Sequence, residues 1–228
     1  MQLLLPVTIN SSQTFESFVG EDSAQIKSEL LQSIKGNDFK CFFLAGGIAT
    51  GKTHLLSACC QAAAQNNKTS ILVPLEQVVM SSPDIVDGIE DMSVVCLDNI
   101  EEIIGKPEWQ VAIFNLFNAL IANNATLVIS GHEIPNNLNV ELPDLASRLQ
   151  WATLYQVKEL TEEEKLQALI KHAHLIGFEL SAEVGRFMLS RLPRKMSFLM
   201  QALETLAKQS IEKQRIVTVP FVKDVLEI

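Results

Sequence analysis

One segment indicates the architecture of the whole domain: Cys41-Phe42-Phe43-Leu44-Ala45-Gly46-Gly47-Ile48-Ala49-Thr50-Gly51-Lys52-Thr53. It begins as a short continuous apolar run and ends in the pattern G-x-x-x-x-G-K-[ST]. Leu55, Leu56 and Cys59 follow at helical spacing, which predicts a helix from Lys52 to about residue 64. A glycine-rich loop between a buried strand and a helix is typical of a phosphate-binding P-loop. The alternative, a glycine-rich turn that arose by chance, leaves both flanking elements unexplained.

The loop points to phosphate chemistry because a phosphate chain needs many close hydrogen-bond donors together with positive charge. Glycines admit a loop whose amides point inward, and the helix N-terminus adds its dipole. The lysine is expected to reach the terminal phosphates, and the hydroxyl of Thr53 to bind Mg²⁺. The predicted nucleotide contacts are therefore Gly46, Gly47, Ala49, Thr50, Gly51, Lys52 and Thr53.

Other apolar runs predict the sheet to which this loop belongs. These runs do not alternate with polar residues, which suits parallel strands covered on both faces. They are residues 70–73, 94–97, 125–129 and 154–157. Helical spacing occurs between them, notably over residues 109–120. Alternation of strands and helices after a P-loop predicts a doubly wound α/β domain over residues 14–157.

The signals change after this domain, because no further strand pattern occurs. Thr161 and Glu164 form a capping box, in which the hydroxyl and the carboxylate each satisfy a free amide at a helix start. Helical spacing follows to residue 176, over residues 182–192 and 195–211, and from about residue 218. Residues 158–228 are therefore predicted to form a small all-helical domain. Residues 1–13 have no periodicity and are predicted to be a flexible tail.

A second candidate site lies at the end of the apolar run over residues 94–97, which is followed directly by Asp98. A carboxylate at this point can hold Mg²⁺ through water, as a Walker-B aspartate does. The alternative is a strand that ends in a turn-prone Asp-Asn pair. Many ATPases of this shape have an acidic residue next, which activates the attacking water. Asn99 cannot accept a proton, so we expect inefficient intrinsic hydrolysis unless Glu101 or Glu102 compensates.

A third candidate is Arg148, in the segment Leu142-Pro143-Asp144-Leu145-Ala146-Ser147-Arg148-Leu149. The leucines form an apolar helical stripe, so Arg148 is expected to project from the edge of the domain. From the pattern alone, a solvated surface arginine is the favoured interpretation. The two tryptophans, Trp109 and Trp151, are expected in or near the core.

The composition excludes several classes of protein. Hydrophobic residues make up 47% of the 228 residues, which is enough for a sizeable core. A net charge of −9 disfavours direct DNA binding, which depends on many lysine and arginine contacts to phosphates. The start of the chain has no basic segment before its apolar residues, and no apolar run approaches about 18 residues, so neither a signal peptide nor a membrane span is predicted. The four cysteines, none in a C-x-x-C pattern, suggest reduced core thiols in the cytoplasm.

Residues 44–58, which contain the loop and continue through His54, resemble the P-loop of bacterial replication initiators of the DnaA family. Residues 14–19 resemble the segment that flanks the adenine in this AAA+ family. The two resemblances add His54, from residues 44–58, and Val19, from residues 14–19, to the expected nucleotide contacts. The resemblance spans nearly the whole chain. It implies an AAA+ fold with a parallel sheet flanked by helices and a C-terminal helical lid. It also implies a bound adenine nucleotide, ADP or ATP, with Mg²⁺ and no other metal.

The strings at residues 142–149, 165–169 and 220–223 resemble a regulatory branch of this family. The sequence shows neither the N-terminal interaction domain nor the C-terminal DNA-binding helix-turn-helix of the initiators. This resemblance implies an adaptor that stimulates ATP hydrolysis by the initiator DnaA and so prevents re-initiation of replication. Arg148 falls at the family's arginine-finger position, which implies that it acts in trans on the nucleotide of a neighbouring initiator.

The beginning of the chain resembles the short peptide by which bacterial proteins dock on the beta sliding clamp of DNA polymerase III. An extended tail can place Leu3 and Leu5 in apolar pockets and use Gln2 as a hydrogen-bonding anchor, followed by Pro6. The resemblance therefore implies a second partner, the clamp. We expect no direct sequence-specific DNA binding, because of the acidic net charge and the missing helix-turn-helix.

The chain departs from the initiators at two positions that sense the nucleotide. His132 occupies the sensor-1 position, which is acidic in the initiators, and Ser197 occupies the position of the sensor-2 arginine. Arg194 or Lys195 is a candidate substitute for that lost cation. Two other functions stay open: a self-contained, helicase-loader-like AAA+ ATPase that acts on its own ATP, and a nucleotide-gated scaffold. A homodimer is one candidate oligomeric state.

Overall fold

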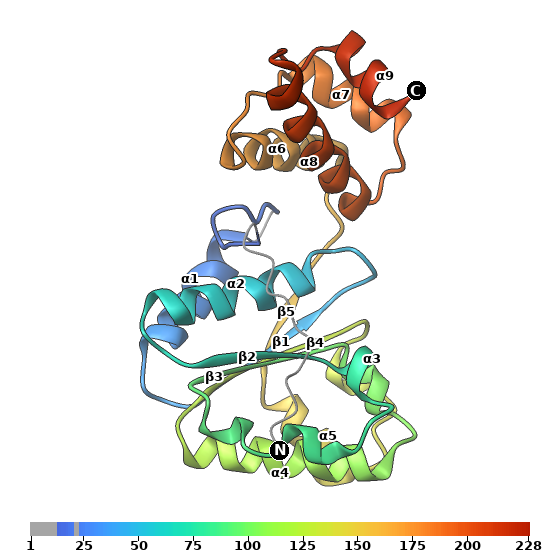
Figure 1. Ribbon diagram of the computed structural model, residues 1–228. Coiled ribbons are helices and arrows are strands. Elements are labelled where there is room, and N and C mark those ends of the chain that lie inside the picture. Colours follow the sequence, from blue (N-terminus) through green and yellow to red (C-terminus); the bar gives the residue numbers. More distant parts are fainter. Residues whose placement is uncertain (1–12, 21–22) are drawn as a thin grey trace. The chain divides into compact units, whose positions relative to one another are not determined.

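The fold is organised around a five-stranded sheet (Figure 1). Its strands are β1 (Lys40–Ala45), β2 (Ser70–Pro74), β3 (Val94–Asp98), β4 (Thr126–Gly131) and β5 (Thr153–Gln156). Their order is β2-β3-β4-β1-β5, and every neighbouring pair is parallel. All residues of β3 and β4 are buried, because helices cover both faces of the sheet. The predicted parallel α/β sheet is thereby confirmed.

The computed structural model describes residues 13–20 and 23–228, with Ser23 described only by its backbone, and these residues form two compact units. Residues 13–15 and 23–158 make up an α/β unit, and residues 16–20 and 159–228 make up a helical unit. The predicted clamp-binding residues Gln2, Leu3, Leu5 and Pro6 lie outside the described residues. Within the described ranges, no helix is long and apolar enough to cross a membrane.

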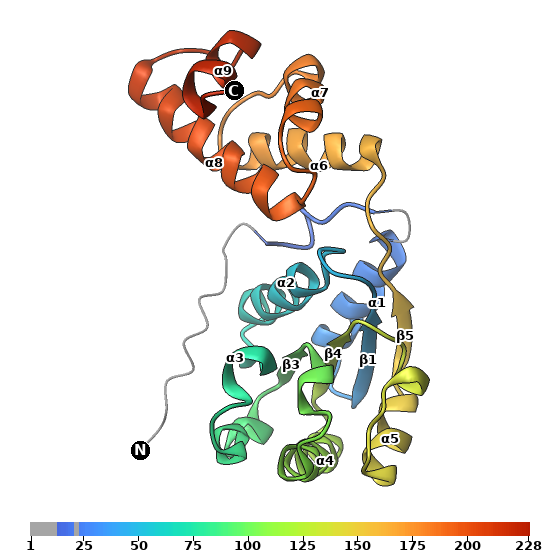
Figure 2. The same cartoon turned by 90° about the vertical axis from the view of Figure 1, so that its right-hand side faces the viewer.

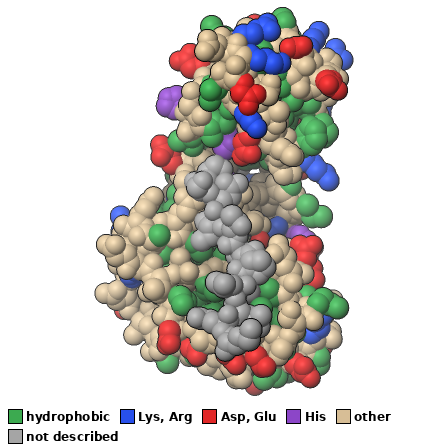
Figure 3. Space-filling view, in the orientation of Figure 1, with side chains coloured by type: hydrophobic (Ala, Val, Ile, Leu, Met, Phe, Trp, Pro, Cys, Tyr) green, Lys and Arg blue, Asp and Glu red, His purple; other side chains and the backbone are tan. Residues whose placement is uncertain are grey.

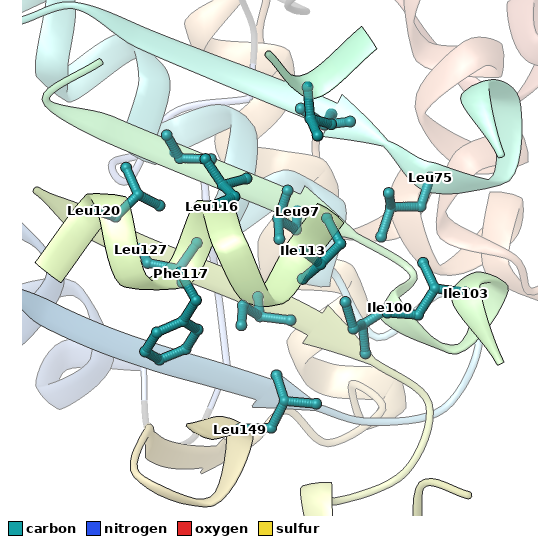
Figure 4. Close-up of a cluster of buried hydrophobic side chains, with 14 of the residues drawn as sticks. Leu75, Leu97, Ile100, Ile103, Ile113, Leu116, Phe117, Leu120, Leu127 and Leu149 are labelled. Carbon is teal, nitrogen blue, oxygen red and sulfur yellow. The ribbon is translucent and has the colours of Figure 1, made fainter. Parts of the chain in front are cut away.

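Two layers of helices enclose the sheet of the α/β unit. Figure 1 shows α1 (Ser23–Lys35) and α2 (Lys52–Gln65) on one face, with α4 (Pro107–Ala122) and α5 (Pro143–Gln150) on the other. Short helical turns complete the unit: α3 (Leu75–Val78), η1 (Pro83–Val86), η2 (Ile89–Asp91), η3 (Ile100–Ile103) and η4 (Pro135–Asn137). Figure 4 shows α4 packing its apolar side chains toward the strands, among them Ile113, Leu116, Phe117 and Leu120. This core fixes the strand ends that carry the candidate site.

The helical unit consists of four helices in its described residues, which Figures 1 and 2 show in orange and red. They are α6 (Glu162–Leu175), α7 (Ala182–Arg191), α8 (Met196–Lys213) and α9 (Val219–Leu226). The capping box is confirmed, because the amide of Thr161 donates to Glu164 Oε2 at 2.8 Å and the amide of Glu164 donates to Thr161 Oγ1 at 3.3 Å. Gly177 adopts φ 93° just beyond α6, which explains why the helix ends there.

The structure differs from the predicted strands at one functionally important end. The apolar run predicts a strand over residues 125–129, but β4 continues through Ser130 to Gly131, which pair with Leu44 and Ala45. Ala125 is not part of the strand, since its amide donates to the carbonyl of Leu120 at 3.0 Å. The extension matters because it carries a buried serine to the edge of the sheet where the P-loop begins.

Candidate functional site

The candidate site forms where three parallel strands end together. In the sheet register, Ala45 lies opposite Gly131, and Leu97 lies opposite Ile129. Asp98, the last residue of β3, therefore comes to the same edge as Ser130 of β4 and the loop that follows β1. The carboxyl ends of parallel strands are the usual place for a ligand in such a sheet.

The backbone of the P-loop is shaped by close approach and by left-handed residues. The amide of Gly46 donates to the carbonyl of Gly131 at 3.1 Å, so the loop leaves the sheet directly. A Cβ at Gly46 would lie 2.3 Å from the carbonyl oxygen of Val157, which only glycine avoids. Gly51 has φ 99° and starts α2, while Ala49 has φ 63°. The loop thus leads directly into the N-terminus of α2, where an anion is favoured.

Lys52 is folded back onto this loop. Its Nζ donates to the carbonyl oxygens of Gly46 at 2.7 Å and Gly47 at 2.8 Å. Burial lowers the pKa of Lys52, while the negative charges of Glu101 and Asp98 act in the opposite direction. The carbonyl oxygens stabilise the positive charge of Lys52 only in part. A phosphate chain in the loop would supply a full negative charge beside it.

The two sequence motifs meet at Thr53 and Asp98. The hydroxyl of Thr53 donates to Asp98 Oδ2 at 2.7 Å, and the hydroxyl of Ser130 donates to the other oxygen, Oδ1. The same Ser130 oxygen accepts the amide of Asn99 at 2.9 Å. A hydroxyl beside an oriented carboxylate is an oxygen-rich set of the kind that Mg²⁺ prefers.

Glu101 is held beside this group by His132. Its Oε1 lies 2.7 Å from His132 Nδ1, and its Oε2 accepts the amide of His132 at 3.3 Å. Asn99, by contrast, turns its amide toward Glu76 Oε2 at 3.4 Å. The sensor-1 candidate His132 is exposed and contacts Glu101, whereas the buried contact to Asp98 is made by Ser130.

The segment that precedes α1 is anchored to the helix of the P-loop. His54 Nε2 lies 2.9 Å from the carbonyl oxygen of Thr14, and the amide of Gln61 donates to the carbonyl of Gln13 at 3.0 Å. His54 therefore ties down the segment that was expected to flank the adenine. Val19, another predicted contact, is half-buried in the helical unit.

The sensor-2 candidate Ser197 is exposed in the first turn of α8, within the helical unit. Of the cations near it, Arg194 lies 3.7 Å from Glu162 Oε1 and Lys195 precedes the helix as its N-cap residue. All three side chains are accessible at one end of α8.

Arg148 lies in the last turn of α5, which the core holds firmly. Leu145 and Leu149 of the same helix are fully buried, and the buried side-chain oxygen of Gln110 accepts the amide of Leu142 at 2.9 Å, just before the helix. The guanidinium carbon of Arg148 lies 4.1 Å from the centre of the Trp151 ring. The expectation that both tryptophans are buried is wrong for Trp151, which is 64% exposed, although Trp109 is buried.

Sequence reasoning missed three side chains of these sites. Ser130 had no signal beyond its place after an apolar run, Glu76 lies just after β2, and Trp151 was expected in or near the core. The structure brings together Lys52 and Thr53 with Asp98. Among the described residues, no group of three or more His, Cys, Asp or Glu side chains could hold a metal ion.

Both units of the chain are similar to parts of known bacterial proteins. Residues 9–156 match the family of the bacterial DnaA ATPase domain, and residues 162–226 match the lid domain of Hda. Domain III of the replication initiation protein DnaA from Thermotoga maritima is 22% identical with a TM-score of 0.76, covering 97% of this chain and 98% of that one. AMPPCP-bound DnaA from Aquifex aeolicus is 20% identical with a TM-score of 0.69, covering 91% and 70%.

A more distant likeness extends the same fold to another protein. A RuvB variant from Thermotoga maritima is 13% identical with a TM-score of 0.64, covering 94% of this chain and 71% of that one. Identities this low indicate the fold alone. Together these likenesses confirm the predicted AAA+ fold with its C-terminal helical lid.

Proposed function

The chain belongs to the family of the bacterial DnaA ATPase domain, and from this premise we propose that it is a regulatory adaptor of the Hda type. It binds an adenine nucleotide at its own P-loop and docks on the beta sliding clamp of DNA polymerase III through residues 2–6. It then presents Arg148 to the ATP-bound initiator DnaA and stimulates hydrolysis there, which blocks re-initiation of replication. The expected location is the cytoplasm.

Nucleotide binding is supported by the arrangement around the P-loop. Lys52 is a buried cation among carbonyl oxygens, and Thr53 and Asp98 form a hydroxyl–carboxylate pair at 2.7 Å. These groups fit a phosphate chain and a Mg²⁺ ion that is bound directly by the hydroxyl and through water by the carboxylate. The likeness to DnaA solved with AMPPCP favours an adenine nucleotide. The metal would neutralise phosphate charge in this position.

The observation that carries the proposal is the freedom of Arg148. It is the only arginine in residues 1–158, and its guanidinium makes no hydrogen bond or ion pair to any residue of the described ranges. An arginine with unused N–H donors can stabilise the charge of a transferring phosphoryl group, which is worth several orders of magnitude in known fingers.

The location of Arg148 favours action on a neighbour's nucleotide. Gln156 pairs with Ala45, directly before the P-loop, whereas Thr153 starts the same strand. At about 3.3 Å per residue, the start of β5 lies roughly 10 Å from the P-loop end. Figure 2 shows that α5 ends beside the start of β5. Arg148, in the last turn of α5, therefore lies near the end of this edge strand that is farther from the P-loop. Delivery in trans is the geometry that this separation supports.

The alternative is a self-contained ATPase, and one contact favours it. Glu101 interacts with Lys52 through charge and lies beside His132, so a carboxylate is present near the phosphate site although Asn99 is neutral. Steady-state ATPase of the isolated protein separates the two functions. The adaptor requires near-zero turnover, and brisk turnover that is lost in Glu101→Gln would favour the alternative.

The clamp contact is tested by removing the tail. Initiator ATP hydrolysis is measured on DNA loaded with the clamp, with and without this protein, and clamp affinity is measured directly. Deletion of residues 1–6 should abolish clamp binding and most of the stimulation, because Leu3 and Leu5 supply the apolar anchors. Full-length protein with Leu3→Ala and Leu5→Ala is the matched variant and should behave alike. Unchanged clamp affinity in both would refute the docking claim.

A further inference from the structure

Trp151 is unusual because it is a large aromatic side chain that contributes little to the core. It is 64% exposed, and it follows α5 directly as its C-cap residue. Its amide donates to the carbonyl of Arg148 at 3.1 Å, so the two residues are fixed to each other through the backbone as well. Stability of the fold therefore gives no sufficient reason for a tryptophan at this position.

The contact between the two side chains is a cation–π stack. The Arg148 Cζ lies 4.1 Å from the centroid of the Trp151 ring, well inside the range of about 6 Å for this interaction. An aromatic ring offers no oxygen or nitrogen acceptor here, and the guanidinium of Arg148 makes no hydrogen bond to the described residues, so its five N–H donors are not used by such an acceptor. The tryptophan thus restrains the charged group without consuming the hydrogen bonds that a phosphate would need.

The stack also competes with a nearby carboxylate. Asp144 lies four residues before Arg148 in α5, a spacing at which opposite charges on a helix attract each other. No ion pair joins them. Among the side chains of the described residues, Arg148 has a charge or ring contact with Trp151 alone. The guanidinium of Arg148 therefore lies against the Trp151 ring at the C-terminal end of α5 and not in an ion pair with Asp144.

We infer that Trp151 is a positioning residue for Arg148, whose guanidinium it holds beside its ring with the N–H donors free for the nucleotide phosphates of a neighbouring ATPase. This inference rests on the proposed finger role of Arg148 and adds the residue that prepares the finger for it. Restraining a long side chain before docking lowers the conformational entropy that is lost when the complex forms its transition state.

The test compares Trp151→Phe with Trp151→Leu in full-length protein, using ATP hydrolysis by the initiator on clamp-loaded DNA. Leucine keeps an apolar side chain but has no ring face, whereas phenylalanine keeps a weaker one. The Leu variant should lower the maximal stimulated rate about two- to fivefold, as expected for an exposed cation–π contact, and the Phe variant should lie between it and the wild type. The protein concentration that gives half-maximal stimulation should not change.

Two outcomes would overturn the inference. Equal maximal rates for the Leu variant and the wild type would show that no ring is needed. A raised half-maximal concentration with an unchanged maximal rate would make Trp151 a docking contact instead. Nucleotide affinity and the melting temperature confirm that both variants fold, which an exposed site favours. Arg148→Ala separates the finger role of Arg148 from the positioning role of Trp151. If Arg148→Ala retains full stimulation, the finger role fails. If Arg148→Ala loses stimulation while Trp151→Leu keeps the wild-type rate, only the role of Trp151 is refuted.

Discussion

Among single residues, Ser130 connects the parts of the nucleotide site most directly. It is fully buried, donates to Asp98 Oδ1 and accepts the amide of Asn99 at 2.9 Å. One hydroxyl therefore sets the orientation of the carboxylate that faces Thr53 and the path of the chain after β3. Removal of this hydroxyl takes a partner from Oδ1 of the buried Asp98 and from the amide of the half-buried Asn99.

We expect Ser130→Ala to lower the free energy of unfolding by about 1–3 kcal/mol, because a carboxylate oxygen of the buried Asp98 and the amide of the half-buried Asn99 lose this partner. Nucleotide affinity in Mg²⁺ should fall severalfold, since Asp98 is no longer held. Ser33→Ala is the matched control, because Ser33 is also buried and shares a hydrogen bond of 2.9 Å with Thr126 at the far end of β4. Thermal unfolding and nucleotide titration measure both effects. Equal affinity of the two variants would contradict the assigned role of Ser130.

The sequence allowed some residues of the site to be predicted and hid others. Lys52, Thr53 and Asp98 follow from local patterns whose spacing reflects one chemistry. Ser130 could not be predicted, because its contact depends on which strand lies beside β3. Trp151 could not be placed either, since the size of a side chain indicates burial only on average and the end of α5 points it outward.

Among the elements, α6 contains a buried histidine that makes its unit sensitive to pH. His172 is 5% exposed, and its Nε2 has no hydrogen-bond partner in the described part of the chain. Burial lowers its pKa, and the charge of Glu204 from α8 opposes this shift only in part. The folded helix therefore favours the neutral ring.

Because the pKa of His172 is lower in the folded state, the helical unit should lose stability as the pH falls below about 6.5, where the unfolded chain binds the proton first. Above that pH the His172 ring is neutral in both the folded and the unfolded state, so its protonation no longer lowers the free energy of unfolding. The slope can reach at most about 1.4 kcal/mol per pH unit for one proton. His172→Leu should flatten the melting temperature between pH 5 and 7 relative to wild type, as measured by calorimetry on the full chain. An unchanged pH dependence in this variant would contradict the prediction.

The helices and strands were largely predictable, because apolar periodicity and caps act locally. The capping box of α6 and the buried strands β1 to β3 follow from a few residues each. The end of β4 was not predictable, since Ser130 and Gly131 are paired by the register with β1 rather than by their own strand propensity. Short turns such as η3 were also missed, because four residues carry too little periodicity.

In the whole molecule, the charge is divided unevenly between the two sequence regions. Residues 159–228 contain equal numbers of basic and acidic residues, so the net charge of −9 belongs to residues 1–158. On the face in view, Figure 3 shows blue lysine and arginine side chains mainly on the helical unit. An acidic α/β region with a single arginine lacks the many basic side chains that binding to the DNA backbone requires.

The central claim is that Arg148 acts on a nucleotide held by another protein, and a single-turnover experiment tests it most directly. DnaA preloaded with ATP labelled in the γ-phosphate is mixed with this protein, preloaded with unlabelled ADP, on clamp-loaded DNA. The wild type should release labelled phosphate at least a hundredfold faster than Arg148→Ala, with Arg148→Lys close to the alanine variant because lysine lacks the planar fork. Equal phosphate release by the wild type and Arg148→Ala would contradict the claim.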